Sequence, residues 1–70
     1  MERNLYVRLK LAEFRLTQTW LMEKLRDKGI LADPAEISKS LSGELTTPKA
    51  KRITASSVEI INDYESRRAI

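Results

Sequence analysis

The sequence has no cysteine and no histidine, and its 70 residues include only two glycines and two prolines. These absences exclude disulfides and the usual thiolate and imidazole ligands of zinc, and they remove the commonest catalytic nucleophiles and bases. No uncharged run approaches the roughly 18 apolar residues of a membrane span, and the opening MERNLYVRLK lacks the apolar core of a signal peptide. We therefore expect a cytoplasmic protein that is not an enzyme, with no cofactor, metal, membrane partner or small-molecule substrate.

The chain length and the net charge further limit the kind of protein that this sequence can encode. A chain of 70 residues is one domain at most, and a domain of this size buries only about 60% of the surface that its unfolded chain exposes. Thirteen Lys and Arg against ten Asp and Glu give a net charge of +3. The basic excess lies in residues 1–15 and 36–52, whereas residues 59–68 hold three acids and two bases. This modest excess fits a polyanionic partner.

Apolar residues recur at helical spacing along almost the whole chain, with no repeat, low-complexity tract or linker. In the first helix Leu5, Leu9 and Ala12 follow this spacing, Val7 and Phe14 can be added to the set, and Asn4 is placed to cap its start. The second begins at the N-cap Thr17 and stops at a glycine. In the last helix the run ITASSV is weakly helix-forming, so the sequence allows a break near residue 55 in one otherwise long helix. The predicted helices span residues 5–14, 18–28, 34–42 and 48–67.

The third helix has the strongest start signal, in DPAEISKSLSG. Asp33 can cap the helix, Pro34 sits at the first helical position, and Glu36 stands where it completes a capping box. Thr47 and Pro48 repeat the cap and proline at the start of the fourth helix. The pattern places Ile37, Ser40 and Leu41 inside. The outer face of the third helix then holds small or polar side chains: Ala35, Glu36, Ser38, Lys39 and Ser42.

Two short helices in close succession, with a helix before and another after, are typical of a helix-turn-helix unit. LTQ opens the second helix, ISKSL lies within the third, and LSGEL closes it before a helix that starts with proline. In this order the motifs resemble the helix-turn-helix family of lambda repressor and Cro (XRE-type), over roughly residues 8–61. TQTWL and L-x-G-x-L-x-T-P-K also look like small phage and mobile-element regulators of Gram-positive bacteria. The sequence departs from the family at Met22, where a small residue is usual, and at ILAD, which lengthens the turn.

The resemblance implies an all-α, lambda-repressor-like domain of four to five helices that binds double-stranded DNA. The third helix would then enter the major groove. Lys39 can donate to guanine, Glu36 can accept from cytosine N4, and Ala35 can meet a thymine methyl. The implied base-contacting residues are Ala35, Glu36, Ser38 and Lys39. The implied phosphate-contacting residues are Thr17, Gln18, Ser42, Thr46, Thr47, Lys49, Lys51 and Arg52.

Each of these residues also has a plainer interpretation. Glu36 can be a capping residue alone, Gln18 a tolerated polar residue, and the lysines and Arg52 a solvated surface. Trp20 is expected to pack between the second and fourth helices.

Three functions remain open. The first is a transcriptional regulator, a repressor that binds an inverted repeat as a homodimer. Its dimer surface would comprise Val58, Ile60, Ile61, Tyr64 and Ile70. The second is an architectural DNA-binding protein or recombination directionality factor, and the third a helical protein-interaction module such as an antirepressor. The sequence leaves open the operator, the regulated gene, the sign of regulation, the oligomeric state, and whether residues 43–54 form a β-wing.

Overall fold

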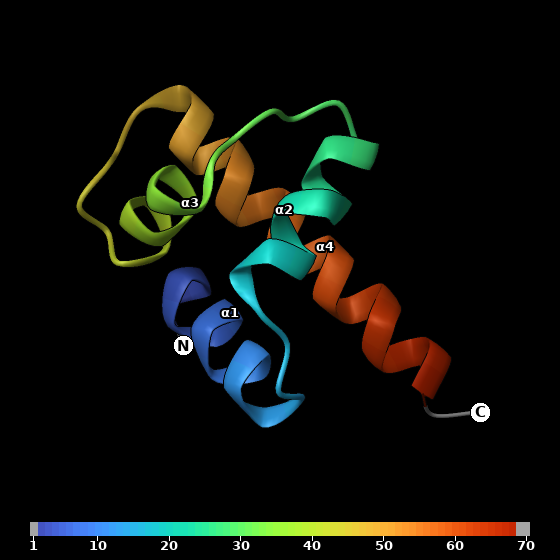
Figure 1. Cartoon of the computed structure of the whole chain (residues 1–70). Coiled ribbons are helices and arrows are strands. Elements are labelled where there is room, and N and C mark those ends of the chain that lie inside the picture. The colour runs from blue at the N-terminus through green and yellow to red at the C-terminus, as the bar shows by residue number, and fades with distance from the viewer. Residues whose placement is uncertain (1, 69–70) are drawn as a thin grey trace.

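A computed structural model describes residues 2–68 of the chain, and these residues form four α-helices (Figure 1). The helices are α1 (Arg3–Glu13), α2 (Gln18–Asp27), α3 (Pro34–Leu41) and α4 (Pro48–Arg68). Residues 2–68 contain no strand, so the all-α prediction is confirmed and no β-wing forms between residues 43 and 54. Within the same residues, no helix has the length and apolar content that crossing a bilayer requires.

Three of the helices begin where their capping residues predict. Thr17 Oγ1 accepts a hydrogen bond from the Trp20 amide at 3.0 Å, and Asp33 Oδ1 accepts one from the Glu36 amide at 2.7 Å. At the start of α4, Thr47 Oγ1 accepts one from the Ala50 amide at 3.1 Å. Each cap satisfies one amide that has no acceptor within its helix, so the caps fix the start of α2, α3 and α4.

The prediction that Asn4 caps the first helix is wrong. The helix begins earlier, with Glu2 at the N-cap and no side-chain capping bond. Asn4 lies inside the first turn instead, and its Oδ1 accepts a hydrogen bond from Thr54 Oγ1 of α4 at 2.7 Å. The Asn4 side chain therefore bonds to a residue of another helix instead of capping its own. The local sequence around Asn4 does not reveal this partner.

The ends of α1, α2 and α3 share one geometry. A residue with positive φ follows the C-cap in each case: Arg15 (56°), Gly29 (85°) and Gly43 (84°). The next amide bonds back to the carbonyl five residues earlier, as in Ile30 N to Leu25 O at 2.9 Å. These Schellman-type ends satisfy carbonyls that the helix leaves free. Glycine adopts this conformation without strain, whereas Arg15 is held in it despite its side chain.

The helix α4 is continuous, in agreement with the predicted span 48–67, and the break that the sequence allowed near Ala55 does not occur. Two of its weakly helix-forming residues, Thr54 and Ser57, are buried, and their hydroxyls have partners. Ser57 is fully buried and its Oγ donates to the Ile53 carbonyl at 2.6 Å, while Thr54 bonds to Asn4. Tertiary packing thus overrides the low helix propensity of this segment.

One apolar core joins all four helices. Its buried members are Val7, Leu11, Leu21, Leu25, Ile30, Ile37, Leu41, Ile53, Ile60 and Ile61. In α1 the buried residues are Val7 and Leu11, while Leu5 and Leu9 are 38% and 49% exposed. The spacing of Leu5, Leu9 and Ala12 therefore correctly indicates a helix but marks its outer side.

Candidate nucleic-acid interface

The helix α3 presents a small, polar outer face to solvent. Its inner residues Ile37 and Leu41 are buried, and Ser40 is buried with its Oγ bonded to the Glu36 carbonyl at 2.8 Å. On the other side Ala35, Ser38 and Lys39 are exposed. Short side chains allow another surface to approach the helix closely.

Glu36 differs from its neighbours, because its carboxylate already has a partner. Its Oε1 lies 3.1 Å from Lys49 Nζ in the first turn of α4, and the side chain is 30% exposed. Its amide donates to Asp33, but residues 2–68 show no bond in which the carboxylate returns to the Asp33 amide. The predicted capping box is therefore half formed, and the carboxylate neutralises a lysine that is expected to contact phosphate.

The N-terminal turns of α2 and α4 suit a phosphate better than that of α3. The first amides of a helix have no acceptor within it and carry the positive end of the helix dipole. The first turns of α2 and α4 contain no acidic residue, whereas α3 starts with Asp33 and Glu36. In Figure 1, α3 lies between these two acid-free turns. Anionic groups would accordingly be favoured on either side of α3 rather than at its start.

The side chains predicted to contact phosphate are all exposed. They are Thr17, Gln18, Ser42, Thr46, Thr47, Lys49, Lys51 and Arg52. Thr17 and Thr47 cap helices, and Ser42 ends α3 with its Oγ bonded to the Lys39 carbonyl at 3.1 Å. Among residues 2–68, the ion pairs engage Lys49 but not Lys39, Lys51 or Arg52. These three cations remain available to a partner.

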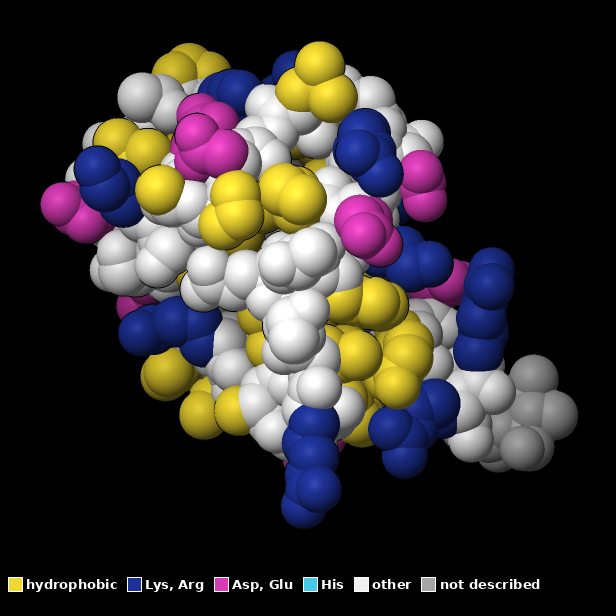
Figure 2. Space-filling view, in the orientation of Figure 1, with side chains coloured by type: hydrophobic (Ala, Val, Ile, Leu, Met, Phe, Trp, Pro, Cys, Tyr) yellow, Lys and Arg dark blue, Asp and Glu magenta, His cyan; other side chains and the backbone are white. Residues whose placement is uncertain are grey.

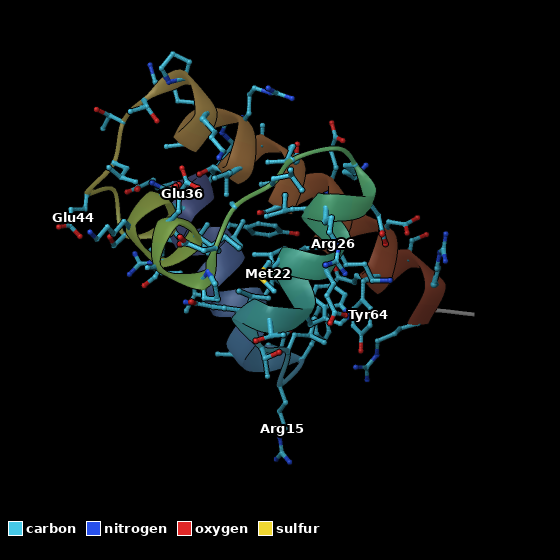
Figure 3. All side chains as sticks on the ribbon, turned by 45° about the horizontal axis from the view of Figure 1, so that its top comes forward. Arg15, Met22, Arg26, Glu36, Glu44 and Tyr64 are labelled. Carbon is cyan, nitrogen blue, oxygen red and sulfur yellow. The ribbon has the colours of Figure 1, made fainter. Side chains whose placement is uncertain are left out.

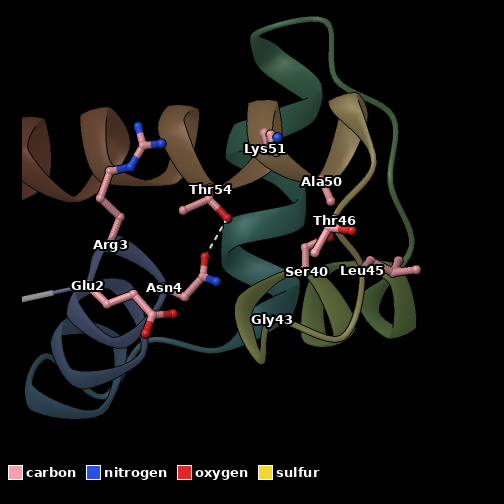
Figure 4. A pocket seen from close by; sticks show the side chains of 10 residues that line it. All are labelled: Glu2, Arg3, Asn4, Ser40, Gly43, Leu45, Thr46, Ala50, Lys51 and Thr54. Atoms are coloured by element: carbon pink, nitrogen blue, oxygen red, sulfur yellow. Dashed lines mark hydrogen bonds between the residues drawn. The ribbon is translucent and has the colours of Figure 1, made fainter.

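Sequence reasoning missed one neighbour of this surface, Arg3. A shallow pocket of about 230 Å³ lies between the start of α1, the segment after α3 and the start of α4 (Figure 4). The cationic Arg3 and Lys51, the acidic Glu2 and the hydroxyl-bearing Thr46 are among the residues that line it. Arg3 is distant from Lys51 in the sequence, so only the packing of α1 against α4 could reveal this pair. The arrangement adds a second cation beside the exit of α3.

The predicted dimer surface is corrected by the structure. Ile60 and Ile61 are 6% and 0% exposed, and both belong to the core of the single chain. Val58 is half-buried against the same core. Ile70 lies outside the described residues. Two isoleucines in succession on α4 are buried together because α1, α2 and α3 all pack against this helix.

Tyr64, the remaining residue of that predicted surface, belongs to an aromatic cluster. Its ring meets those of Phe14 and Trp20 edge-on, with centroids 5.3 and 5.4 Å away. Trp20 thus packs between α2 and α4, as the sequence predicts. Figure 2 shows hydrophobic side chains between α2 and the C-terminal half of α4, with Lys and Arg around them.

An ion pair joins α1 to α4 beside this cluster. Lys10 Nζ lies 2.8 Å from Glu65 Oε2 and 3.3 Å from Glu13 Oε2. The hydrogen bond to Glu65 raises the pKa of Lys10 above its ordinary value of 10.5, against a smaller opposing effect of burial. This pair holds the C-terminal half of α4 against α1, away from α3.

A groove of about 430 Å³ lies between α2, the connection and the start of α3. Met22 and Arg26 line it from successive turns of α2, and Glu36 lines it from the first turn of α3 (Figure 3). Leu31, in the lengthened connection, lines the groove and is 68% exposed. Met22 is half-buried and packs against the core. The connection therefore leaves a cleft beside α3.

The comparisons with known proteins give no assignment. No protein-family model, curated protein or solved structure matches this chain significantly.

Proposed function

We propose that this chain is a sequence-specific double-stranded DNA-binding regulator, a transcriptional repressor, with a lambda-repressor-like helix-turn-helix formed by α2 and α3. The observation that carries the proposal is the position of α3. Its exposed face is small and polar, and in Figure 1 it lies between the N-termini of α2 and α4, whose own first turns contain no acidic residue. A helix flanked by two sites favourable to phosphate fits a major groove, which runs between two phosphate backbones.

In this proposal the two kinds of contact have separate roles. Thr17 and Gln18 at the start of α2, and Thr47 and Arg52 at the start of α4, bind phosphates and fix the position of the domain on DNA. Lys39 reads guanine O6 or N7 from the middle of α3. The resemblance of LTQ, ISKSL and LSGEL to lambda repressor and Cro supports the same assignment of α2 and α3.

Selection from a pool of random duplexes tests the proposal. The full chain would be challenged at about 50 mM and about 200 mM salt, with sequencing of the retained DNA. We expect enrichment of a defined sequence. Lys39→Ala should relax the preference at one base pair by about 5- to 160-fold, which corresponds to about 1–3 kcal/mol of discrimination. Arg67→Ala is the matched control, because it removes one positive charge from a side chain that is 79% exposed and lies near the end of α4.

Two other outcomes would replace the proposal. Salt-dependent retention without sequence preference would favour an architectural DNA-binding protein. No retention at low salt would favour a protein-interaction module, for which the groove beside the exposed Leu31 is the specific observation.

A further inference from the structure

The outer side of α1 carries an apolar stripe that the packing of residues 2–68 leaves exposed. The stripe consists of Leu5, Leu9 and Ala12, all exposed, on the side of the helix opposite the buried Val7 and Leu11. Figure 2 shows hydrophobic side chains along the lower left rim of the molecule, where Figure 1 places α1. The spacing of the stripe, by four and then three residues, is that of the seam between two packed helices.

The charged side chains next to the stripe identify its partner. In the heptad that this seam defines, Leu5 and Ala12 occupy d positions and Leu9 an a position. Arg8 then stands at g and Glu13 at e, and both are exposed. These are the positions whose charges pair across a two-helix seam and set its orientation.

We propose that the stripe binds the same stripe of a second copy of this chain, with the two α1 helices parallel. In a parallel pair each Arg8 lies beside the second copy's Glu13, so the two-fold symmetry creates two ion pairs of opposite charge. In an antiparallel pair the stripe would centre near Leu9, and Arg8 would face the second copy's Arg8. The Arg8–Glu13 pairs therefore favour the parallel orientation. The exposed Glu2, at the a position before Leu5, would meet its own copy at the N-terminal edge of the seam and weaken the pair.

The ion pairs within the chain permit this arrangement. Glu13 contacts Lys10 at 3.3 Å, but its side chain is 59% exposed. Lys10 also holds Glu65 at 2.8 Å, so it keeps a partner when Glu13 turns outward. The dimer would form without disturbing the core.

The parallel orientation has a consequence for DNA, which rests on the proposed function. Both N-terminal ends of α1 would lie at the same end of the dimer, and α3 packs beside that end of α1 in each chain (Figure 1). Two recognition helices at one end could reach successive half-sites of an inverted repeat. The stripe is small, so self-association of the free chain should be weak and two half-sites on one DNA would reinforce it.

Single cysteines test the interface without DNA, because the chain has no cysteine of its own. Positions 5 and 12 are about 10 Å apart along the helix, which is further than a disulfide can bridge. Two chains with the same single cysteine can therefore be linked through α1 only if the two helices are parallel. We expect Leu5→Cys alone and Ala12→Cys alone each to form disulfide-linked dimers on mild oxidation. Ser66→Cys, at an exposed position of α4, is the control for random collision and should not do so.

Other crosslinking results would overturn the proposal. Crosslinking only between the Leu5→Cys and Ala12→Cys chains would show an antiparallel pair, and equal crosslinking of Ser66→Cys would show random collision. Sedimentation gives a second measurement. Leu9→Asp should weaken self-association more than about tenfold, since a charge would enter the seam, whereas Leu31→Asp should leave it unchanged. A chain that is monomeric at every concentration would contradict the proposal while leaving DNA binding by α3 untouched.

Discussion

Replacing Glu36 by Gln should strengthen DNA binding and change the preference for the base pair that Glu36 contacts. The Glu36 carboxylate lies 3.1 Å from Lys49 Nζ, with side-chain exposures of 30% and 46%. An ion pair this close to the surface is worth about 0.2–1 kcal/mol. Releasing Lys49 to a phosphate should therefore tighten binding to random duplex by about 1.5- to 5-fold. One additional phosphate contact should also steepen the salt dependence by about 0.9, or roughly 3.5-fold in affinity between 50 and 200 mM salt.

Fluorescence anisotropy on a labelled random duplex, measured over a salt series, is the assay. Glu59→Gln is the matched control: it removes one carboxylate, 71% exposed and paired with Lys28, roughly 15 Å along α4 from Lys49. It should give a smaller change in affinity and leave the salt slope unaltered. Adding Lys49→Ala to Glu36→Gln should return the slope to that of the unmodified chain. Equal slopes for Glu36→Gln and Glu59→Gln would refute the assignment of Lys49 to phosphate.

Two further predictions concern stability. Ile61→Val should lower the free energy of unfolding by about 0.5–1.5 kcal/mol and the Tm by roughly 2–12 °C, because Ile61 is fully buried within one chain. Thermal circular dichroism should show this shift equally at all protein concentrations, and a shift that varies with concentration would instead indicate an interface. Glu65→Gln should lower the pKa of Lys10 toward 10.5, since its hydrogen bond is the main cause of the raised value. A raised lysine pKa means that the pairing stabilises the fold fully below pH 10.5 and is lost as the pH rises through the raised pKa. NMR titration of the Lys10 side chain measures this, and an equal effect of Glu59→Gln would contradict it.

Local signals in the sequence predicted the elements well. Thr17, Asp33 and Thr47 each cap the helix that they were expected to cap, and Gly29 and Gly43 adopt the positive φ of a helix end. A cap or a stop depends on a few neighbouring residues, so its pattern can be recognised without knowledge of the fold.

Features that depend on packing were harder to predict. Asn4 resembles a cap but bonds to Thr54, and Arg15 ends α1 in a conformation that favours glycine. Periodicity located α1 but not its inner side, because Leu5 and Leu9 share the spacing of a buried stripe while Val7 and Leu11 form the core. Which of two apolar sides is buried depends on what α3 and α4 offer as partners.

In the candidate site, too, the features set by local sequence could be predicted and the features set by packing could not. The outer face of α3 followed from the positions of its buried residues, because a helix buries only one side. The pairing of Glu36 with Lys49, and the pocket that Arg3 and Lys51 both line, follow from how α1, α3 and α4 meet. The contacts of Lys39 with bases remain a prediction.

The most direct test of the central claim is an NMR titration of the full chain with a duplex obtained from the selection. The account predicts that amide shifts concentrate on α3, on the first turn of α2 and on residues 42–52, with Lys39 among the most affected. Shifts concentrated on the outer side of α1, or on the aromatic cluster around Tyr64, with α3 unaffected, would contradict it.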